Sequence, residues 1–283
     1  NSSHTSDFYI DKLREKFLEA VDSHLQSDRP LAFSLSGGLD SSALVLAAHH
    51  LHPTKNFNLY TFCSSVPAYS ELKWAQYVAS YCNLQLRKVS YSNDELLGNL
   101  DDLLSCQEQP FVSASVYAQF HIMKTASANG DKVIIEGQGA DELFSGYSGY
   151  YRYHLSAANL SNISSILSSS LRNRGIAHTV QDFLLSKIRY APFYCALRLH
   201  STRGVKHTSL FKFLHGLEPL REISTILNNY YDDTATSFKA HSAHLIYVAG
   251  LQSLLRHSDR NSMRFSIESR VPFLYRPLIE LCH

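Results

Sequence analysis

Apolar residues recur with two different periods along the first half of the chain. Short apolar runs typical of buried strands are LAFSLS (31–36), NLYTFC (58–63), LQLRKVS and KVIIE (132–136). Between them, apolar residues recur at helical spacing over 7–26, 41–51, 70–83, 93–105 and 114–128. Ser6 and Ser70 are predicted N-caps, and Asn129–Gly130 ends the last of these helices. Strict alternation of strand and helix predicts an α/β fold, a parallel sheet with helices on both faces.

The pattern changes beyond about residue 147. A Tyr- and His-rich stretch, YSGYYRYHL, is followed by the Ser-rich SNISSILSSS and then by helical stretches such as TVQDFLLSKIRYA. No further strand is predicted. We therefore expect an α/β domain over residues 1–147 and a helical C-terminal subdomain over residues 148–283.

Composition narrows the class of protein. The chain has 283 residues, of which 45% are hydrophobic and 18% charged, and its net charge is +1. This balance is typical of a soluble enzyme and gives no broad basic surface for nucleic acid or anionic membranes. No apolar window is long enough to span a membrane, and the first residues do not resemble a signal peptide. The five scattered cysteines indicate free thiols in a reducing, cytoplasmic setting.

The stretch SGGLDSS follows the first predicted strand and opens the next helix, where open parallel sheets bind ligands. Its glycines permit a tight turn, and its backbone N–H and hydroxyl groups form an anion site suited to phosphate. Asp40 would repel phosphate unless a cation lies between them, which predicts Mg²⁺. A simple Gly/Ser-rich helix cap is the structural alternative, but it leaves Asp40 unexplained. The motif is neither GxxxxGK[ST] nor GxGxxG.

A second loop, EGQGADEL, follows the strand KVIIE and is expected at the same edge of the sheet. Gly137 and Gly139 free backbone groups for ligand contact, and Asp141 and Glu142 place two carboxylates at a helix start. We predict that Asp141 joins Asp40 in holding Mg²⁺, with water and phosphate completing the shell. The alternative for Asp141 is an N-cap.

SGGLDSS resembles the pyrophosphate-binding loop of the N-type ATP pyrophosphatases, which cleave ATP between its α- and β-phosphates. Three further stretches, QEQPFVSASVYAQF (107–120), IIEGQGADELFSGY (134–147) and DRNSMRFSIESRVPFL (259–274), are similar in type and order to asparagine synthetase. The resemblance covers its synthetase domain only. It implies an adenine-nucleotide α-hydrolase-like sheet with a helical C-terminal subdomain.

The resemblance also implies residue roles. Nucleotide contacts are expected from two loops and two strand ends: Ser34, Leu35, Ser36, Gly37, Gly38, Asp40, Ser41, Ser42, Ser64, Glu136 and Gly137. The catalytic positions are Gln138, Asp141 and Glu142, and the metal ligands are Asp40 and Asp141. We assign Pro272 and Phe273 to packing, and the charged residues Arg260, Glu268 and Arg270 to an ion-pair framework rather than to phosphate.

The chemistry implied is ATP-dependent amide synthesis. A carboxylate, first of all the β-carboxylate of aspartate, is adenylated, and ammonia then gives asparagine, AMP and pyrophosphate. A glutaminase domain is expected in the parent protein, and a homodimer is a further expectation. One alternative is a related ligase acting on another carboxylate, as in β-lactam or lasso-peptide ring closure. Another is a non-catalytic interaction protein that keeps the fold.

The sequence departs from the resemblance at four points. Gln138 stands where glutamate is expected, and Gln109 stands where an acid is expected, so neither can act as a base or hold a charge. The start NSSHTS carries no glutaminase segment. The intermediate-stabilising lysine is expected downstream of ESRVPFL, beyond His283, so we expect a truncated synthetase domain with little adenylation activity of its own.

Overall fold

The computed structural model describes residues 6–64, 70–109, 111, 113–147 and 250–282, with a few single residues between 164 and 246. By contacts the chain divides into two units, Asn1–Phe144 with Gly250–His283, and Ser145–Ala249. The helical subdomain expected from residue 148 lies, as far as residue 249, almost wholly outside the described residues. The stretch from Gly250 onward belongs with the α/β unit.

The first unit is built on a parallel five-stranded sheet with the order β3-β2-β1-β4-β5. Its strands are β1 (Leu31–Ser34), β2 (Asn58–Phe62), β3 (Leu86–Val89), β4 (Val133–Ile135) and β5 (Glu268–Arg270). The first four lie inside the four apolar runs predicted as strands. The α/β fold with a parallel sheet is therefore confirmed.

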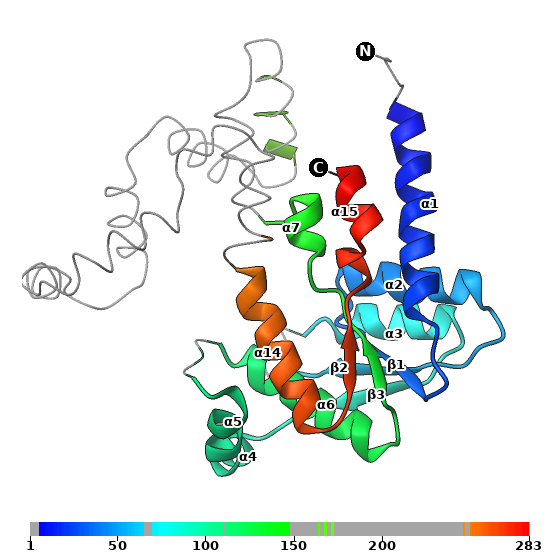
Figure 1. The fold of residues 1–283 in the computed structure, drawn as a ribbon. Coiled ribbons are helices and arrows are strands. Elements are labelled where there is room, and N and C mark those ends of the chain that lie inside the picture. Colours follow the sequence, from blue (N-terminus) through cyan, green and yellow to red (C-terminus); the bar gives the residue numbers. More distant parts are fainter. Residues whose placement is uncertain are drawn as a thin grey trace, which may run out of the picture. The chain divides into compact units, whose positions relative to one another are not determined.

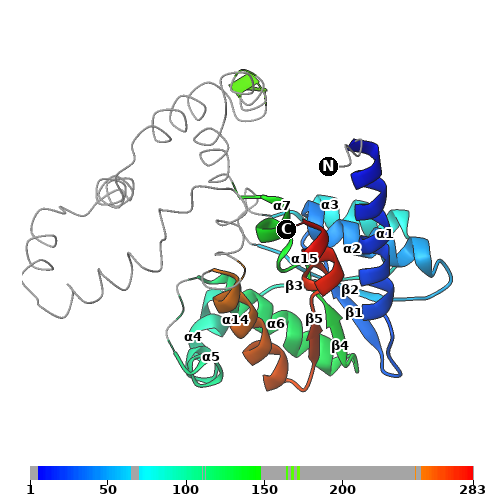
Figure 2. The same cartoon turned by 45° about the horizontal axis from the view of Figure 1, so that its top comes forward.

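The helices cover both faces of this sheet (Figure 1, Figure 2). The α-helices of the described residues are α1 (Ser6–His24), α2 (Leu39–Leu51), α3 (Leu72–Tyr81), α4 (Asn93–Gly98), α5 (Leu100–Gln107), α6 (Ser115–Ala128), α7 (Ala140–Phe144), α14 (Leu251–Arg264) and α15 (Arg276–Cys282). Helices α2 and α3 connect β1 to β2 and β2 to β3, which follow one another toward one side of the sheet. The connection through α6 runs back from β3 to β4, on the other side of β1. Because parallel crossovers are right-handed, this reversal puts α6 on the opposite face.

The sheet is buried between these helices. One cluster joins the strands to α6 through Tyr60, Ile122, Met123, Ile134 and Ile267, and every residue of β4 is buried. A strand buried on both faces must be apolar throughout, which explains the continuous run in KVIIE. No helix in the described part of the chain has the length and apolar character needed to cross a membrane.

Two local predictions are wrong. Strands do not stop near residue 147, because Glu268–Arg270 pairs in parallel with β4 as β5. This strand is short, polar and only partly buried, so it has no apolar pattern; its backbone pairing with β4 and the contacts of its side chains hold it in place. Ser70 is not the cap of α3, since the N-cap position is Glu71 and no side chain caps it.

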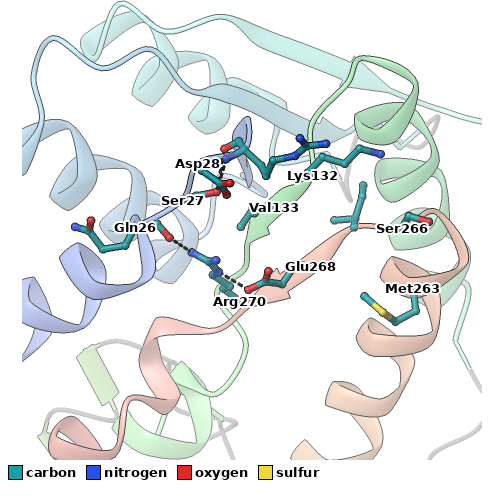
Figure 3. Close-up of a pocket in the computed structure, with 11 residues that line it drawn as sticks. Gln26, Ser27, Asp28, Lys132, Val133, Met263, Ser266, Glu268 and Arg270 are labelled. Carbon is teal, nitrogen blue, oxygen red and sulfur yellow. Dashed lines mark hydrogen bonds and ion pairs between the residues drawn. The ribbon is translucent and has the colours of Figure 1, made fainter.

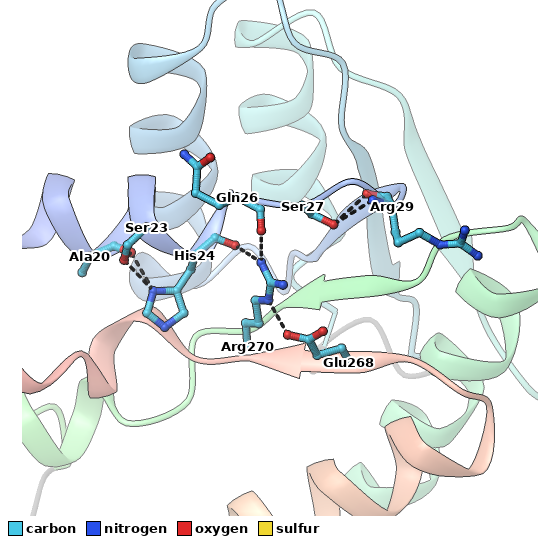
Figure 4. Close-up of polar contacts among 8 residues, drawn as sticks. All are labelled: Ala20, Ser23, His24, Gln26, Ser27, Arg29, Glu268 and Arg270. Carbon is cyan, nitrogen blue, oxygen red and sulfur yellow. Dashed lines mark hydrogen bonds and ion pairs between the residues drawn. The ribbon is translucent and has the colours of Figure 1, made fainter.

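Arg270 fixes β5 to the end of α1 (Figure 4). Its Nη1 donates to the carbonyl oxygens of His24 and Gln26, both at 2.8 Å, and its Nε donates to the Glu268 carboxylate at 2.7 Å. The guanidinium satisfies two backbone carbonyls at a helix C-terminus, where cations are favoured. An ion-pair framework role for Glu268 and Arg270 is confirmed.

Replacing Arg270 with lysine should lower the free energy of unfolding by about 1–3 kcal/mol, because an ammonium cannot reproduce the planar donor fork. Urea denaturation of both forms measures this change. The control is Arg14→Lys, since Arg14 forms a helix-surface pair with Asp11 and its side chain is 66% exposed. Equal denaturation midpoints for the Arg270 variant and the unmodified protein would contradict this role.

Candidate active site

The two predicted loops meet where the strand order reverses. Because β1 pairs with β4, the loop after β1 (35–41) and the loop after β4 (136–141) leave the same edge of the sheet side by side. A Cβ on Gly137 would lie 3.4 Å from the Ser41 nitrogen and 3.5 Å from the Asp40 Cβ. The loops are therefore in close contact, at the switch point where open α/β sheets bind ligands.

The SGGLDSS loop is held in shape by its own hydroxyl groups. Ser36 Oγ and Ser41 Oγ lie 3.0 Å apart, and the N–H of Gly38 donates to Ser36 Oγ at 3.1 Å. Gly37 adopts a φ of +99°, and a Cβ there would meet the Glu71 carbonyl oxygen at 2.6 Å. Glycine is thus required by both the conformation and the contact with α3.

The loop leads directly into α2, whose first turn leaves backbone N–H groups without helical partners. Such a turn favours an anion. Of the other predicted contacts, Leu35 donates its N–H to the Tyr60 carbonyl at 2.8 Å, and Ser42 donates its N–H to the Gly38 carbonyl at 3.2 Å. These two N–H groups are therefore engaged within the protein, and an anion would use the remaining donors of the turn.

Asp40 and Asp141 are brought together across the two loops. Burial raises the pKa of Asp40, and the Asp141 carboxylate and then Glu142 raise it further. Burial also raises the pKa of Asp141. Two partly buried acids that repel each other fit a site for a divalent cation, which would relieve the repulsion.

The donor set suits Mg²⁺ bound to phosphate rather than a metal held by protein alone. Among the residues that the structure describes, no group of three or more His, Cys, Asp or Glu side chains is arranged to hold a metal ion. Mg²⁺ commonly takes one or two carboxylates and completes its shell with water and phosphate oxygens. Asp40 and Asp141 together match that pattern.

The remaining predicted residues lie along the same edge. Ser34 is half-buried at the end of β1, and Ser64 lies two residues beyond the end of β2, the neighbouring strand. Gln138 is half-buried within the second loop, and Glu142 is buried in α7. Glu136 is 4% exposed, and its carboxylate accepts hydrogen bonds from Gln119 and Ser269 at 2.7 Å and from Ser258.

Sequence reasoning missed the chain of amide side chains that begins at Glu136, in which Gln119 donates to Glu136, Asn261 to Gln119 and Gln107 to Asn261. Gln119, Asn261 and Gln107 lie in helices far apart in the chain, and their only signal is an amide in a helical stretch of the sequence. Glu71, which packs behind Gly37, gave no signal either. Arg260 forms an ion pair with Glu108 at 2.6 Å, separate from the pair between Glu268 and Arg270. The four cysteines in the described part of the chain are free thiols.

A cavity of ≈ 690 Å³ lies at the other end of the sheet (Figure 3). It is lined by Val133 and Glu268, the first residues of β4 and β5, and by the segment that leads into β1. Ligands of open parallel sheets bind at the carboxyl ends of the strands, so this position is opposite to the expected one. The switch point remains the candidate site.

Fold and loops together define an α/β protein with an open parallel sheet and a candidate ligand site at the switch point between β1 and β4. Comparison with known proteins narrows this class. The model of the asparagine synthase family matches residues 12–283, so the chain belongs to this family.

Individual relatives agree with this assignment. The chain is 29% identical over 285 residues to the glutamine-hydrolysing asparagine synthetase 2 of Bacillus subtilis (strain 168), covering 97% of this chain and 33% of that protein. It is 33% identical over 144 residues to a Zea mays asparagine synthetase, covering 48% of this chain and 24% of that protein. It is also 29% identical over 156 residues to the amidase chry2 of Gibberella zeae, covering 50% and 23%. The chain thus spans a third or less of each of these curated relatives.

Gly37→Ala should distort the SGGLDSS loop, because the added Cβ would clash with backbone atoms of Glu71 and Ala75 at a positive φ. We expect a loss of about 1–3 kcal/mol in the free energy of unfolding, together with weaker Mg·ATP binding. Gly98→Ala is the matched control, since no atom lies within 4 Å of a Cβ at that position. Denaturation and calorimetric titration with Mg·ATP provide the measurements. If both variants behave alike, the loop tolerates a side chain at residue 37.

Asp40→Asn should stabilise the ligand-free protein at neutral pH. The pKa of Asp40 is raised in the folded state, so its ionisation destabilises the fold as pH rises above the ordinary value of 3.8. The gain in melting temperature should therefore be present at pH 7 and disappear as the pH falls below that value. Asp101→Asn, at the same position in the first turn of α5, should only lose a favourable helix-dipole interaction. A lower melting temperature for the Asp40 variant at pH 7 would contradict the repulsion.

Proposed function

We propose that the chain is the synthetase part of an ATP-dependent amide synthetase. It adenylates a carboxylate, in the first instance the β-carboxylate of aspartate, and transfers the acyl group to ammonia. Membership of the asparagine synthase family supports this class of reaction. The observation that carries the proposal is the contact between the SGGLDSS loop and the Gly137 loop, which brings Asp40 and Asp141 to one switch point.

The reaction has two steps. A carboxylate oxygen of the substrate attacks the α-phosphorus of ATP, and the bond to the bridging oxygen of the β-phosphate breaks, so pyrophosphate leaves. Ammonia then attacks the acyl carbon, AMP leaves, and an amide forms. The protein's part is to position the two substrates and to neutralise charge on the leaving pyrophosphate.

The residues have separate parts in these steps. The N–H groups at the start of α2 and the serine hydroxyl groups of the loop would bind the pyrophosphate oxygens. Asp40 and Asp141 would hold Mg²⁺, which when bound neutralises phosphate charge. Ser34, Ser64, Glu136 and Gly137 would border the nucleoside. Glu136 would do so through its backbone carbonyl, since its carboxylate and its N–H have protein partners.

Gln138 constrains the second step. An amide side chain has no titratable proton near neutral pH, so Gln138 cannot remove the proton that the attacking ammonia must lose. It can hydrogen-bond a substrate or an intermediate. The proton therefore passes to water or to the departing AMP phosphate. Glutamine as a nitrogen source would need a glutaminase region, as the names of the relatives indicate for those proteins.

Transfer of oxygen from the carboxylate to AMP tests the adenylation. The full-length protein, incubated with Mg·ATP, ammonium and ¹⁸O-labelled aspartate, should release pyrophosphate and AMP containing ¹⁸O, as measured by mass spectrometry. Asp40→Asn and Asp141→Asn should each reduce pyrophosphate release by at least about 10²–10³-fold. The double variant should be little worse, because residues acting as one unit are non-additive. Asp101→Asn should leave the rate unchanged.

Each other outcome corrects a different part of the proposal. Labelled AMP from another carboxylate, with none from aspartate, would keep the reaction and replace the substrate. ADP with labelled phosphate would mean that the carboxylate is phosphorylated rather than adenylated. Binding of Mg·ATP without turnover of any carboxylate would favour a non-catalytic interaction protein.

A further inference from the structure

A buried hydrogen-bond network runs from the nucleotide edge of the sheet to the end of α5. It starts at Glu136, directly after β4, whose carboxylate accepts from side chains of α6, α14 and β5. It continues through Gln119, Asn261 and Gln107, and Glu136, Asn261 and Gln107 are at most 4% exposed. We call these four residues the Glu136 network. Figure 1 shows α6 and α14, which carry two of them, packed side by side.

Each link of the network has one direction. Carboxylate oxygens accept hydrogen bonds, so the Gln119 Nε2 faces Glu136 at 2.7 Å and its Oε1 faces Asn261. Asn261 Nδ2 donates to Gln119 Oε1 and to the Val116 carbonyl, both at 2.9 Å. The Asn261 Oδ1 then accepts from Gln107 Nε2 at 2.7 Å. The Glu136 carboxylate and the Val116 carbonyl can only accept hydrogen bonds. Each of them therefore requires an amide nitrogen to face it, the Nε2 of Gln119 and the Nδ2 of Asn261.

The network ends on His257. Gln107 Oε1 can only accept, so the His257 Nδ1, 2.6 Å away, carries the proton. Burial lowers the pKa of His257, with a smaller effect of Arg256, which keeps the ring neutral near pH 7. Gln107 is the last residue of α5, and Glu108 follows with a φ of +57°. The network therefore fixes the turn that begins the QEQP stretch.

We propose that Gln119 and Asn261 are positioning residues. They hold the Gln107–Glu108 turn at a fixed position relative to the carboxyl ends of the strands, where the nucleotide is proposed to bind. This inference rests on the proposed function and on the resemblance of QEQPFVSASVYAQF to asparagine synthetase, which implies that this stretch approaches the carboxylate substrate. Neither residue touches the phosphate loop in the described structure; both act through their neighbours. A misplacement of about 1 Å between reactants costs about 10²-fold in rate. The position of the Gln107–Glu108 turn should therefore affect the rate of reaction with the carboxylate more than the affinity for ATP.

A charge exchange separates this role from ordinary packing. Gln119→Glu places a second carboxylate against Glu136 and removes the donor that joined them. The double variant Gln119→Glu/Glu136→Gln restores every link, because the amide introduced at position 136 can donate to the carboxylate introduced at position 119. The same amide can accept from Ser258 and Ser269, and the new carboxylate can still accept from Asn261. The exchange thus keeps the shape and the hydrogen bonds and moves only the charge.

In the full-length protein, Gln119→Glu should lower kcat/KM for the carboxylate by about 10²-fold while the Kd for Mg·ATP stays unchanged. The double variant should recover most of this loss. The NMR signal of the His257 ring, assigned by its absence in His257→Gln, should shift in the single variant and return in the double one. Asn58→Asp is the matched control: it places a carboxylate beside buried Asp131 at the opposite end of β4. It should lower stability without this selective loss.

Several results would overturn the proposal. One is a single variant that leaves both the His257 signal and the carboxylate kinetics unchanged. Another is equal loss of Mg·ATP and carboxylate binding that the double variant does not restore, which would indicate a merely structural role. If Gln119→Glu does not fold, Gln119→Met cuts the same link without charge and should show the same split. If no carboxylate reacts at all, the proposed function fails. The change in the NMR signal of the His257 ring in Gln119→Glu then decides by itself whether the network links Glu136 to the Gln107–Glu108 turn.

Discussion

The parallel pairing of β1 with β4 is the constraint on which the rest of the unit depends. It brings residues near 35 and near 136 to one edge of the sheet and marks the point where the crossovers change direction. Helices before and after this point therefore cover opposite faces, and the two loops meet where open α/β sheets bind ligands. The SGGLDSS loop, the paired acids Asp40 and Asp141, and the start of the Glu136 network all lie at this junction.

The junction stores electrostatic repulsion in the ligand-free protein. Asp40 and Asp141 share one edge although their carboxylates disfavour each other's charge. The first turn of α2 meanwhile offers donors to an anion. Neither feature stabilises the fold by itself, and each is complementary to a ligand: a cation for the acids and a phosphate for the turn. A nucleotide with its metal would satisfy both at once, which is why stability and binding oppose each other at Asp40.

The sequence predicts the parts whose signals are local. The strand Val133–Ile135 is apolar throughout because it is buried beside β1. The approach of Asp40 to Asp141 follows from two loops that leave neighbouring strand ends on one edge of the sheet. The edge strand β5 is not predictable in this way, since ESR is polar and is held by pairing with a strand more than a hundred residues earlier. Gln119 and Asn261 pair across a similar separation, and an amide in a helix does not reveal which distant group it faces.

The carboxyl end of β4 joins the two halves of the site. Glu136 and Gly137 are adjacent, and the structure uses them in opposite ways. The Glu136 side chain is long and buried and reaches α6, α14 and β5, whereas Gly137 lies against the first turn of α2. The Glu136 carboxylate can only accept hydrogen bonds, so it fixes the orientation of the side-chain amides of Gln119, Asn261 and Gln107. A polar network in which every group is hydrogen-bonded is rigid. Two adjacent residues thus contact the helices on one face of the sheet and the SGGLDSS loop on the other.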